Sequence, residues 1–244
     1  MKSRGNRDRG VLITKVGMEM DPEKKGLSAA WIARAVEDSL QRLQTDRIDV
    51  YFSHRHDPDV PVQETLQAYD RLIAAGKVRS IGASNFSADQ LAEALQVAAK
   101  EGLPRYEVLQ PEYNLYDRAS YDGELRDLAM AEGLGVITYY SLASGFLSGK
   151  YHSAADLNKS PRGGGIEAYL DERGLRILAA LDEIADQHAA VPAEVAIAWL
   201  IAREGVTAPI ASATRLDQLE SLIRSTQLSL SEADIARLDH ASAV

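Results

Sequence analysis

The chain has 244 residues, of which 45% are hydrophobic, and both values are typical of one globular domain. Its 27 basic and 36 acidic residues give a net charge of −9, which disfavours general binding to nucleic acid or to an anionic membrane. There is no cysteine, so disulfide bonds and thiol catalysis are excluded. The sequence shows neither a signal-peptide core nor an apolar stretch of the roughly 20 residues that span a membrane. We therefore expect a cytoplasmic protein with no nucleic-acid or membrane partner.

Six short, β-branched apolar runs alternate with helical patterns along the chain. The runs cover residues 11–15, 48–54, 79–85, 106–110, 135–140 and 206–212. Apolar residues at helical spacing predict helices over residues 28–44, 62–75, 87–100, 118–132, 173–188, 192–203, 215–225 and 231–241. Ser28 is the expected N-cap of the first helix, and Ser87 with Gln90 forms the expected capping box of the third. This alternation predicts an α/β fold with parallel strands in a single domain, residues 1–244.

Each run ends in a residue that can take part in chemistry or binding. In a parallel α/β barrel the carboxyl ends of all strands meet on one face, where such enzymes keep their active sites. The residues at these ends are Lys15, His54, Ser84 with Asn85, Gln110, Tyr139 and Ser212. Lys15 either acts electrostatically at the barrel mouth or simply extends its ammonium group to solvent.

The segment from His54 to Asp57 allows two interpretations. Strand alternation places His54 and His56 on one face, so His54 either polarises a substrate or forms a metal-binding pair with His56. A metal site needs further histidine or carboxylate ligands at later strand ends. Those ends carry serine, asparagine, glutamine and tyrosine instead, so a metal-dependent barrel hydrolase is the weaker hypothesis and no metal is expected.

Three further features favour a nucleotide. The stretch from Ser144 to Lys150 fails the P-loop spacing, but a glycine-containing turn still exposes N–H groups that can hold pyrophosphate. The ring of Tyr139 is either part of the core or a flat platform for a heterocycle. Arg215, where the last strand meets its helix, is either a phosphate ligand or a solvated side chain.

Taken together, these residues resemble the aldo-keto reductase family. The matching segments are VLITKVG, TDRIDVYFSHRHDPDVPVQETLQAYDRLIAAGKVRSIGASNFSADQL, LQPEYNLYDR, GVITYYSLASGFLSGKY and APIASATRLDQLESL. The resemblance extends over nearly everything from Val11 onward and is closest to the subgroup with a long loop after the seventh barrel strand. It implies a TIM-type (β/α)8 barrel that reduces aldehydes or ketones with NADPH, so that the partners are NADP(H) and a small carbonyl substrate.

The resemblance also implies roles for individual residues. Lys15 and His54 match the lysine and histidine of the catalytic tetrad. The remaining matches are cofactor contacts. Ser84, Asn85 and Gln110 match residues that bind the nicotinamide carboxamide, and Tyr139 matches the ring stacked on the nicotinamide. The turn from Leu142 to Leu147, which includes Ser144 and Gly145, matches pyrophosphate contacts together with Lys150, while Ser212, Arg215 and Gln218 match the region around the adenosine 2′-phosphate. Ser221 stands where many members have an asparagine near adenine, which is a departure from the pattern.

A second departure concerns the start of the chain. In the family, a strand like VLITK is the third of eight, and the tetrad aspartate and the catalytic tyrosine precede it. Here that strand begins at residue 11, and no other tyrosine qualifies as the acid: Tyr51 lies inside a strand and Tyr139 is assigned to stacking. We therefore expect an incomplete, open barrel of about six β/α units, strands 3–8 of the full fold, with possible self-association through its open edges.

Three functions follow. The first is an NADPH-dependent aldo-keto reductase whose own activity is impaired because the tyrosine and aspartate are absent. The second is a non-catalytic NADP-binding or regulatory remnant. The third is the metal-dependent hydrolase built on His54 and His56.

Overall fold

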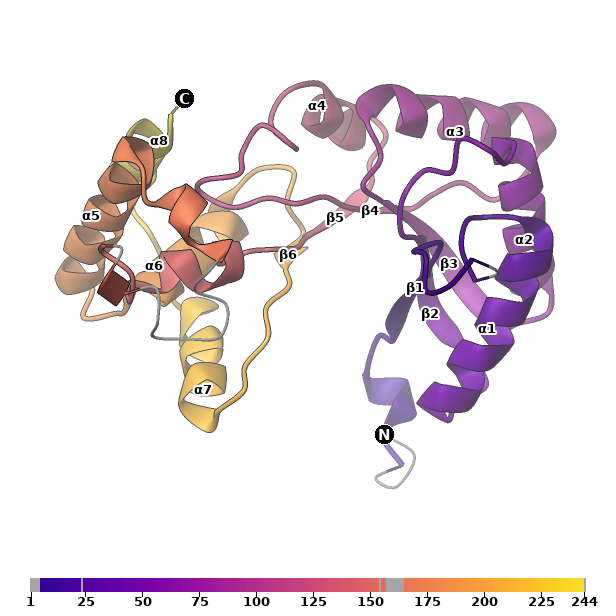
Figure 1. The fold of residues 1–244 in the computed structure, drawn as a ribbon, viewed down its shortest axis with the longest axis horizontal. Coiled ribbons are helices and arrows are strands. Elements are labelled where there is room, and N and C mark those ends of the chain that lie inside the picture. Colours follow the sequence, from indigo (N-terminus) through magenta and orange to yellow (C-terminus); the bar gives the residue numbers. More distant parts are fainter. Residues whose placement is uncertain (1–4, 23, 154, 157–164, 244) are drawn as a thin grey trace. The chain divides into compact units, whose positions relative to one another are not determined.

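The computed structural model describes residues 5–22, 24–153, 155–156 and 165–243. They form two compact units: residues 1–110 and 127–135 make up unit 1, and residues 111–126 and 136–244 make up unit 2. Each unit is described by itself below (Figure 1). None of the helices in these ranges is long and apolar enough to cross a membrane.

Six strands form one parallel sheet, as the alternation of strand and helix predicts. They are β1 (Ile13–Val16), β2 (Ile48–Ser53), β3 (Val78–Ser84), β4 (Val108–Gln110), β5 (Gly135–Thr138) and β6 (Ala208–Pro209), hydrogen-bonded in this order. Among the described residues β1 and β6 are end strands that do not pair with each other, so the sheet is not closed. The structure thus confirms the predicted α/β class and the open, six-stranded parallel sheet, whereas the single-domain boundary of 1–244 stays a prediction.

Three helices of unit 1 cover one side of β1, β2 and β3 (Figure 1). They are α1 (Ala29–Leu43), α2 (Val62–Ala74) and α3 (Ala88–Glu101). Ser28 caps α1 by accepting a hydrogen bond from the backbone N–H of Trp31, and Ser87 forms the predicted capping box with Gln90. Gly102 ends α3 in the left-handed conformation that suits glycine.

Tyrosine hydroxyls fill the space between this sheet and its helices. The Ser53 side chain of β2 lies 2.8 Å from the hydroxyl of Tyr69 on α2 and 2.7 Å from that of Tyr106. Tyr51 packs edge-on against Tyr69 on the same side. Since Tyr51 and Ser53 face the helices, alternation turns their neighbours Phe52 and His54 to the other side of the sheet.

Unit 2 is mainly helical. Its helices are α5 (Glu172–Gln187), α6 (Pro192–Ala202), α7 (Leu216–Ser225) and α8 (Glu232–Ser242), and a 3-10 helix, η3 (Ala143–Ser148), follows β5. Helix α6 is the central one, because every residue from Glu194 to Leu200 is buried. Part of the long loop after β5, residues 157–164, lies outside the described residues.

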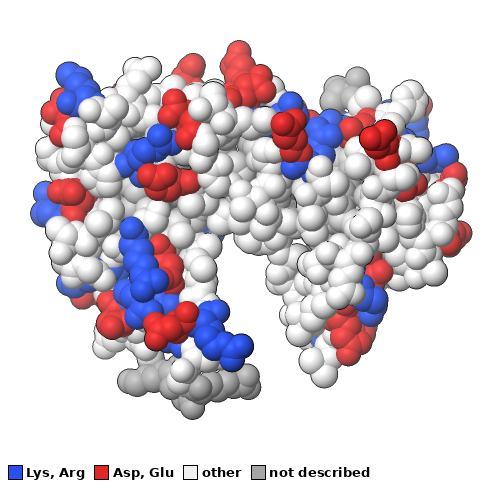
Figure 2. All heavy atoms as spheres, turned by 180° about the vertical axis from the view of Figure 1, so that it is seen from behind, with Lys and Arg blue, Asp and Glu red and all other residues white. Residues whose placement is uncertain are grey.

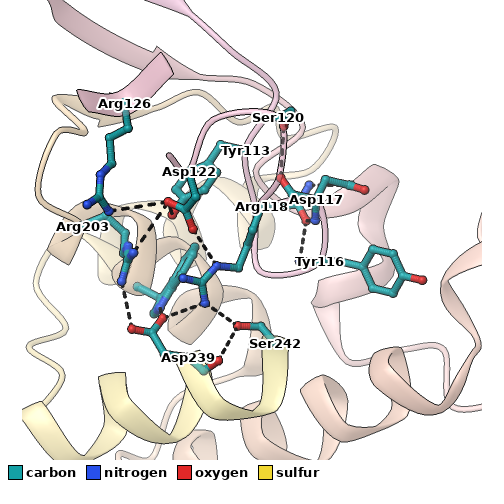
Figure 3. Close-up of polar contacts among 12 residues, drawn as sticks. Tyr113, Tyr116, Asp117, Arg118, Ser120, Asp122, Arg126, Arg203, Asp239 and Ser242 are labelled. Atoms are coloured by element: carbon teal, nitrogen blue, oxygen red, sulfur yellow. Dashed lines mark hydrogen bonds and ion pairs between the residues drawn. The ribbon is translucent and has the colours of Figure 1, made fainter. Parts of the chain in front are cut away.

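An ion-pair network ties the segment after β4 to the end of α6 and to α8 (Figure 3). Asp239 on α8 accepts hydrogen bonds from Arg118 at 3.1 Å, from Arg203 at 2.9 Å and from the indole N–H of Trp199 at 3.1 Å. Arg118 also donates to Asp122 at 2.9 Å. Because Trp199 is fully buried, its N–H needs the partner that Asp239 provides.

The predicted helix over residues 118–132 is wrong in its first half. The observed helix, α4 (Glu124–Ala131), begins six residues later. Residues 118–122 form a tight turn in which Tyr121 and Asp122 donate backbone hydrogen bonds to the Arg118 carbonyl. Gly123 then takes a φ of 95°, which interrupts the helix. The predicted strand over 206–212 is also longer than the observed β6.

A testable consequence concerns Gly82 in the middle of β3. A Cβ atom built there would overlap the ring of Phe52, which lies directly across in register and is fully buried. Gly82→Ala should therefore lower the free energy of unfolding by about 1–3 kcal/mol through overpacking, measured by urea unfolding. Phe52→Leu in the same chain should recover part of that loss. Strictly additive effects of the two substitutions would contradict the proposed overlap.

Candidate functional site

The strand register of unit 1 places four predicted residues on one side of the sheet. Lys15 pairs with Phe52, Phe52 with Gly82, and Ser84 with Gln110. Because side chains alternate, Lys15, His54, Ser84 and Gln110 share the side opposite α2. We call this side the lysine face. Of the predicted residues in unit 1, the structure thus brings these four together.

Burial and like charge govern the electrostatics of the lysine face. Lys15 is half-buried, and removal from water lowers the pKa of its ammonium group. Its Nζ atom lies 6.0 Å from the centroid of the Phe52 ring, and it forms no ion pair with any described residue. Burial also lowers the pKa of His54, and the positive charges of Lys15 and Arg55 lower it further. His54 is therefore held in its neutral form, which can accept or donate a hydrogen bond.

A row of hydrogen bonds joins the ends of β2, β3 and β4. The Asn85 side chain donates from Nδ2 to the His54 carbonyl at 2.8 Å and to Ser84 Oγ at 3.2 Å. Ser84 Oγ donates to the Gln110 carbonyl at 2.8 Å. Asn85 has a φ of 56°, a left-handed conformation that asparagine tolerates better than most residues. These bonds fix the three predicted carboxamide-binding residues relative to His54.

Gln110 carries a polar atom that the chain itself does not satisfy. Its side chain is only 2% exposed, and its Oε1 atom is buried without a hydrogen-bond partner in the described part of the chain. A buried acceptor of this kind costs about 1–3 kcal/mol unless a donor reaches it. An amide N–H of a bound molecule is such a donor, so Gln110 suits a ligand with a carboxamide group.

The lysine face has no tyrosine from unit 1. The three tyrosines of this unit are Tyr51, Tyr69 and Tyr106, and all three lie on the side of the sheet that faces the helices. Burial raises the pKa of each phenol above its ordinary value. They are structural hydroxyl groups and not proton donors for the lysine face.

In unit 2 the ends of β5 and β6 lie next to each other. The Ile210 N–H donates to the Thr138 carbonyl at 2.9 Å, and Ser141 Oγ donates to the Ile210 carbonyl at 2.8 Å. Tyr139 follows β5, and its hydroxyl donates to Glu112 Oε2 at 3.5 Å. Burial and the nearby Asp117 raise the pKa of Glu112, against the effect of the Tyr139 bond. The contact between Glu112 and Tyr139 had no signal in the sequence, because it depends on strand register.

The predicted pyrophosphate turn has an unusual backbone. Ala143, Ser144 and Gly145 take successive φ values of 45°, 57° and 100°. A Cβ atom on Gly145 would lie 3.5 Å from Lys150 Nζ, so the ammonium group lies over this turn. The N–H groups of Ala143, Gly145 and Leu147 donate within the turn, to the carbonyls of Tyr140 and Leu142. The positive charge of Lys150 is therefore the feature of this turn that suits an anion. The structure brings Lys150 close to Gly145 in the turn that runs from Leu142 to Leu147. The role of these residues in binding pyrophosphate stays a prediction.

The residues expected near a 2′-phosphate have partners within the chain. Arg215 donates from Nε and Nη2 to the carboxylate of Asp217, at 3.1 and 2.8 Å. Gln218 Oε1 accepts from the Thr214 N–H at 2.8 Å and from its hydroxyl at 3.1 Å. Ser212 is exposed at the end of the segment that follows β6. Asp217 was not identified from the sequence as a partner of Arg215, although an acidic residue two positions after an arginine suggests an ion pair.

The metal-site alternative built on His54 and His56 finds no support among the described residues. Within the described residues there is no group of three or more histidine, aspartate or glutamate side chains able to hold a metal ion. His56, the second histidine of the proposed metal pair, packs edge-on against Phe86 at 5.6 Å between ring centroids. On the face drawn in Figure 2, lysine and arginine side chains lie among acidic ones. Arg7 and Arg79 both pair with Asp49. An anion would therefore have to be held by local groups, such as those of the turn.

Comparisons with known proteins give one consistent result. The model of the Aldo/keto reductase family matches residues 1–243. The L-glyceraldehyde 3-phosphate reductase of Escherichia coli K12 is 29% identical over 242 residues, covering 96% of this chain and 70% of that protein. A probable voltage-gated potassium channel subunit beta of Arabidopsis thaliana is 34% identical over 85% of this chain and 65% of its own length. The protein tas of Escherichia coli K12 is 31% identical over 96% of this chain and 75% of its own length.

The electrostatic coupling on the lysine face can be tested with Lys15→Met. Removing the cation should raise the pKa of His54, while burial keeps that pKa below its ordinary value of 6.5. An NMR titration of the His54 ring protons measures this change. Lys25→Met is the matched control, because Lys25 is an exposed lysine of unit 1 whose ion pair is with Glu19. An unchanged or lower His54 pKa in Lys15→Met would contradict the coupling.

The strained turn can be tested with Gly145→Ala. At a φ of 100° an alanine is strained whatever space surrounds it, so we expect a loss of about 1–3 kcal/mol of stability, local or global. Thermal unfolding measures a global loss of stability, and hydrogen exchange of residues 142–150 measures a local one. Gly165→Ala is the control in the same unit, since Gly165 has no positive φ and no atom within 4 Å of an added Cβ. Equal effects of the two substitutions would rule out backbone strain as the cause.

Proposed function

The chain belongs to the aldo/keto reductase family, and from this we propose that it binds NADP(H) and acts in the reduction of aldehydes or ketones to alcohols. The observation that carries the proposal is the buried, unpartnered Oε1 of Gln110 at the end of the hydrogen-bonded row through Ser84 and Asn85. A carboxamide presents both N–H donors and a carbonyl acceptor, which suits a row of glutamine, serine and asparagine side chains.

The residues of unit 2 are proposed to bind the rest of the cofactor. The half-buried ring of Tyr139 would stack on the nicotinamide. The turn from Leu142 to Leu147 would contact the pyrophosphate, and Lys150 would offer it a positive charge. Ser212, Arg215 and Gln218 would contact the 2′-phosphate that distinguishes NADPH from NADH, and arginine is the residue best suited to bind such a group through two parallel hydrogen bonds.

The chemistry of the lysine face follows from its charges. When bound, the cofactor supplies a hydride for the carbonyl carbon. The neutral His54 would hydrogen-bond the carbonyl oxygen, and Lys15 would stabilise the negative charge that develops there. The proton for that oxygen needs an acid, and the tyrosines of unit 1 are all on the other side of the sheet. Lys15 also has no described carboxylate partner. We therefore propose that turnover by this chain is impaired.

A non-catalytic role in NADP binding is the second candidate. It is favoured by the same placement of the tyrosines, since the described part of unit 1 has the proposed carboxamide-binding residues but no tyrosine on the lysine face. Similar proteins carry both an enzyme name and a channel-subunit name, so membership of the family is compatible with either role. A cytoplasmic location, and self-association through the end strands β1 and β6, also stay proposals.

Two measurements on one preparation test the proposal. NADPH should bind and change its fluorescence, and Lys150→Met should weaken that binding roughly tenfold because a charged contact to phosphate is lost. Lys100→Met, at an exposed lysine of unit 1 paired with Glu101, should leave it unchanged. Reduction of L-glyceraldehyde 3-phosphate and of simple aromatic aldehydes should be slower than in the reductase relatives by about 10² to 10⁴, the typical share of general acid catalysis.

The outcomes separate the two candidates. Binding with slow turnover supports an impaired reductase, and binding with no turnover supports the non-catalytic role. Turnover equal to that of the relatives would contradict the impairment. No binding of either NADPH or NADH to the folded chain would overturn the proposal as a whole.

A further inference from the structure

The side chain of Arg215 is bound by a neighbour in the same turn. Its Nε and Nη2 atoms donate two parallel hydrogen bonds to the two carboxylate oxygens of Asp217, at 3.1 and 2.8 Å. This is the paired geometry with which arginine binds a carboxylate or a phosphate. The edge of the guanidinium group that could take a phosphate is therefore already in use.

The surrounding turn keeps the two side chains together. Gln218 Oε1 accepts hydrogen bonds from both the N–H and the hydroxyl of Thr214, which closes a loop around Arg215 and Asp217. Arg215 is the N-cap residue of α7 and has an extended backbone. The next arginine on this helix, Arg224, is paired with the buried Glu194 at 2.7 Å and is engaged elsewhere. Within the part of α7 that is described, Asp217 is the acid that Arg215 contacts.

We infer that Asp217 competes with the 2′-phosphate of NADPH for Arg215 and so lowers the preference of the chain for NADPH over NADH. The inference rests on the proposed function, in which Arg215 contacts that phosphate. NADPH must displace the Asp217 carboxylate or share the guanidinium group with it, and the two negative groups then repel each other. NADH has no 2′-phosphate and leaves the pair intact.

The competitor stays charged at neutral pH. The hydrogen bonds from Arg215 lower the pKa of Asp217, and the charge of Arg215 acts in the same direction. Both side chains are about two-thirds exposed, at 68% and 65%. An exposed ion pair of this kind is weak, so a phosphate can displace the carboxylate at a modest loss of affinity. Asp217 is thus expected to tune the cofactor preference without abolishing it.

The test compares two cofactors in matched variants of the full chain. Asp217→Asn keeps the size of the side chain and removes its charge. The dissociation constant of NADPH, measured by fluorescence, should fall about two- to fivefold, the range that exposed ion pairs support. That of NADH should stay the same. Raising the salt concentration should shrink the difference, because the charges are exposed.

Two further variants show whether the effect passes through Arg215. Glu220→Gln removes an equal charge from the exposed surface of the same helix, at a residue with no described hydrogen bond or ion pair to Arg215, and should change neither constant selectively. Arg215→Gln should weaken NADPH binding alone, and adding Asp217→Asn to it should bring no selective gain.

The failures are distinguishable. If Asp217→Asn changes NADPH and NADH alike, or if Glu220→Gln reproduces its effect, the competition is overturned while cofactor binding stands. If neither cofactor binds to the unmodified chain, the proposed function fails, and this inference fails with it.

Discussion

The parallel register of β1 to β4 is the constraint on which the candidate site depends. Because Tyr51 and Ser53 face the helices, the two-residue period of a strand places Phe52 and His54 on the opposite face of the sheet. The register with the neighbouring strands then places Lys15 of β1, Ser84 of β3 and Gln110 of β4 on that same face. A shift of one residue in any strand would exchange the two faces. The hydroxyl contacts of Ser53 with Tyr69 and Tyr106 therefore help to define the lysine face without belonging to it.

The same register explains why the charge of Lys15 and a neutral His54 can be neighbours. Phe52 occupies the lysine face beside Lys15 and packs over Gly82, so the ammonium group lies against a ring instead of a carboxylate. Burial lowers the pKa values of Lys15 and His54 together, and the lysine charge adds to the effect on His54. Because folding lowers the pKa of His54, the unfolded chain binds its proton more tightly. Stability then rises with pH from the folded pKa up to the ordinary value of 6.5.

Local signals in the sequence were enough for some features and not for others. The cap at Ser28 and the capping box at Ser87 were predicted correctly because each depends on a few neighbouring residues. The start of α4 was not, since the apolar pattern continued through a glycine that takes a positive φ. The strand-end residues were predicted by type and position. Their hydrogen bonds, and the buried Oε1 of Gln110, depend on register between segments about thirty residues apart.

The two anion-binding elements proposed in unit 2 differ in how they are prepared for a ligand. The turn at Ala143, Ser144 and Gly145 has a strained backbone whose N–H groups at Ala143 and Gly145 bond within the segment, so Lys150 would supply the charge for a pyrophosphate there. Arg215 is engaged by Asp217, so a 2′-phosphate would have to displace that carboxylate or share the guanidinium group with it. This competition would reduce discrimination between the two nicotinamide cofactors without affecting the pyrophosphate, which both cofactors have. The cofactor preference of this chain would then depend both on Arg215 and on the carboxylate paired with it.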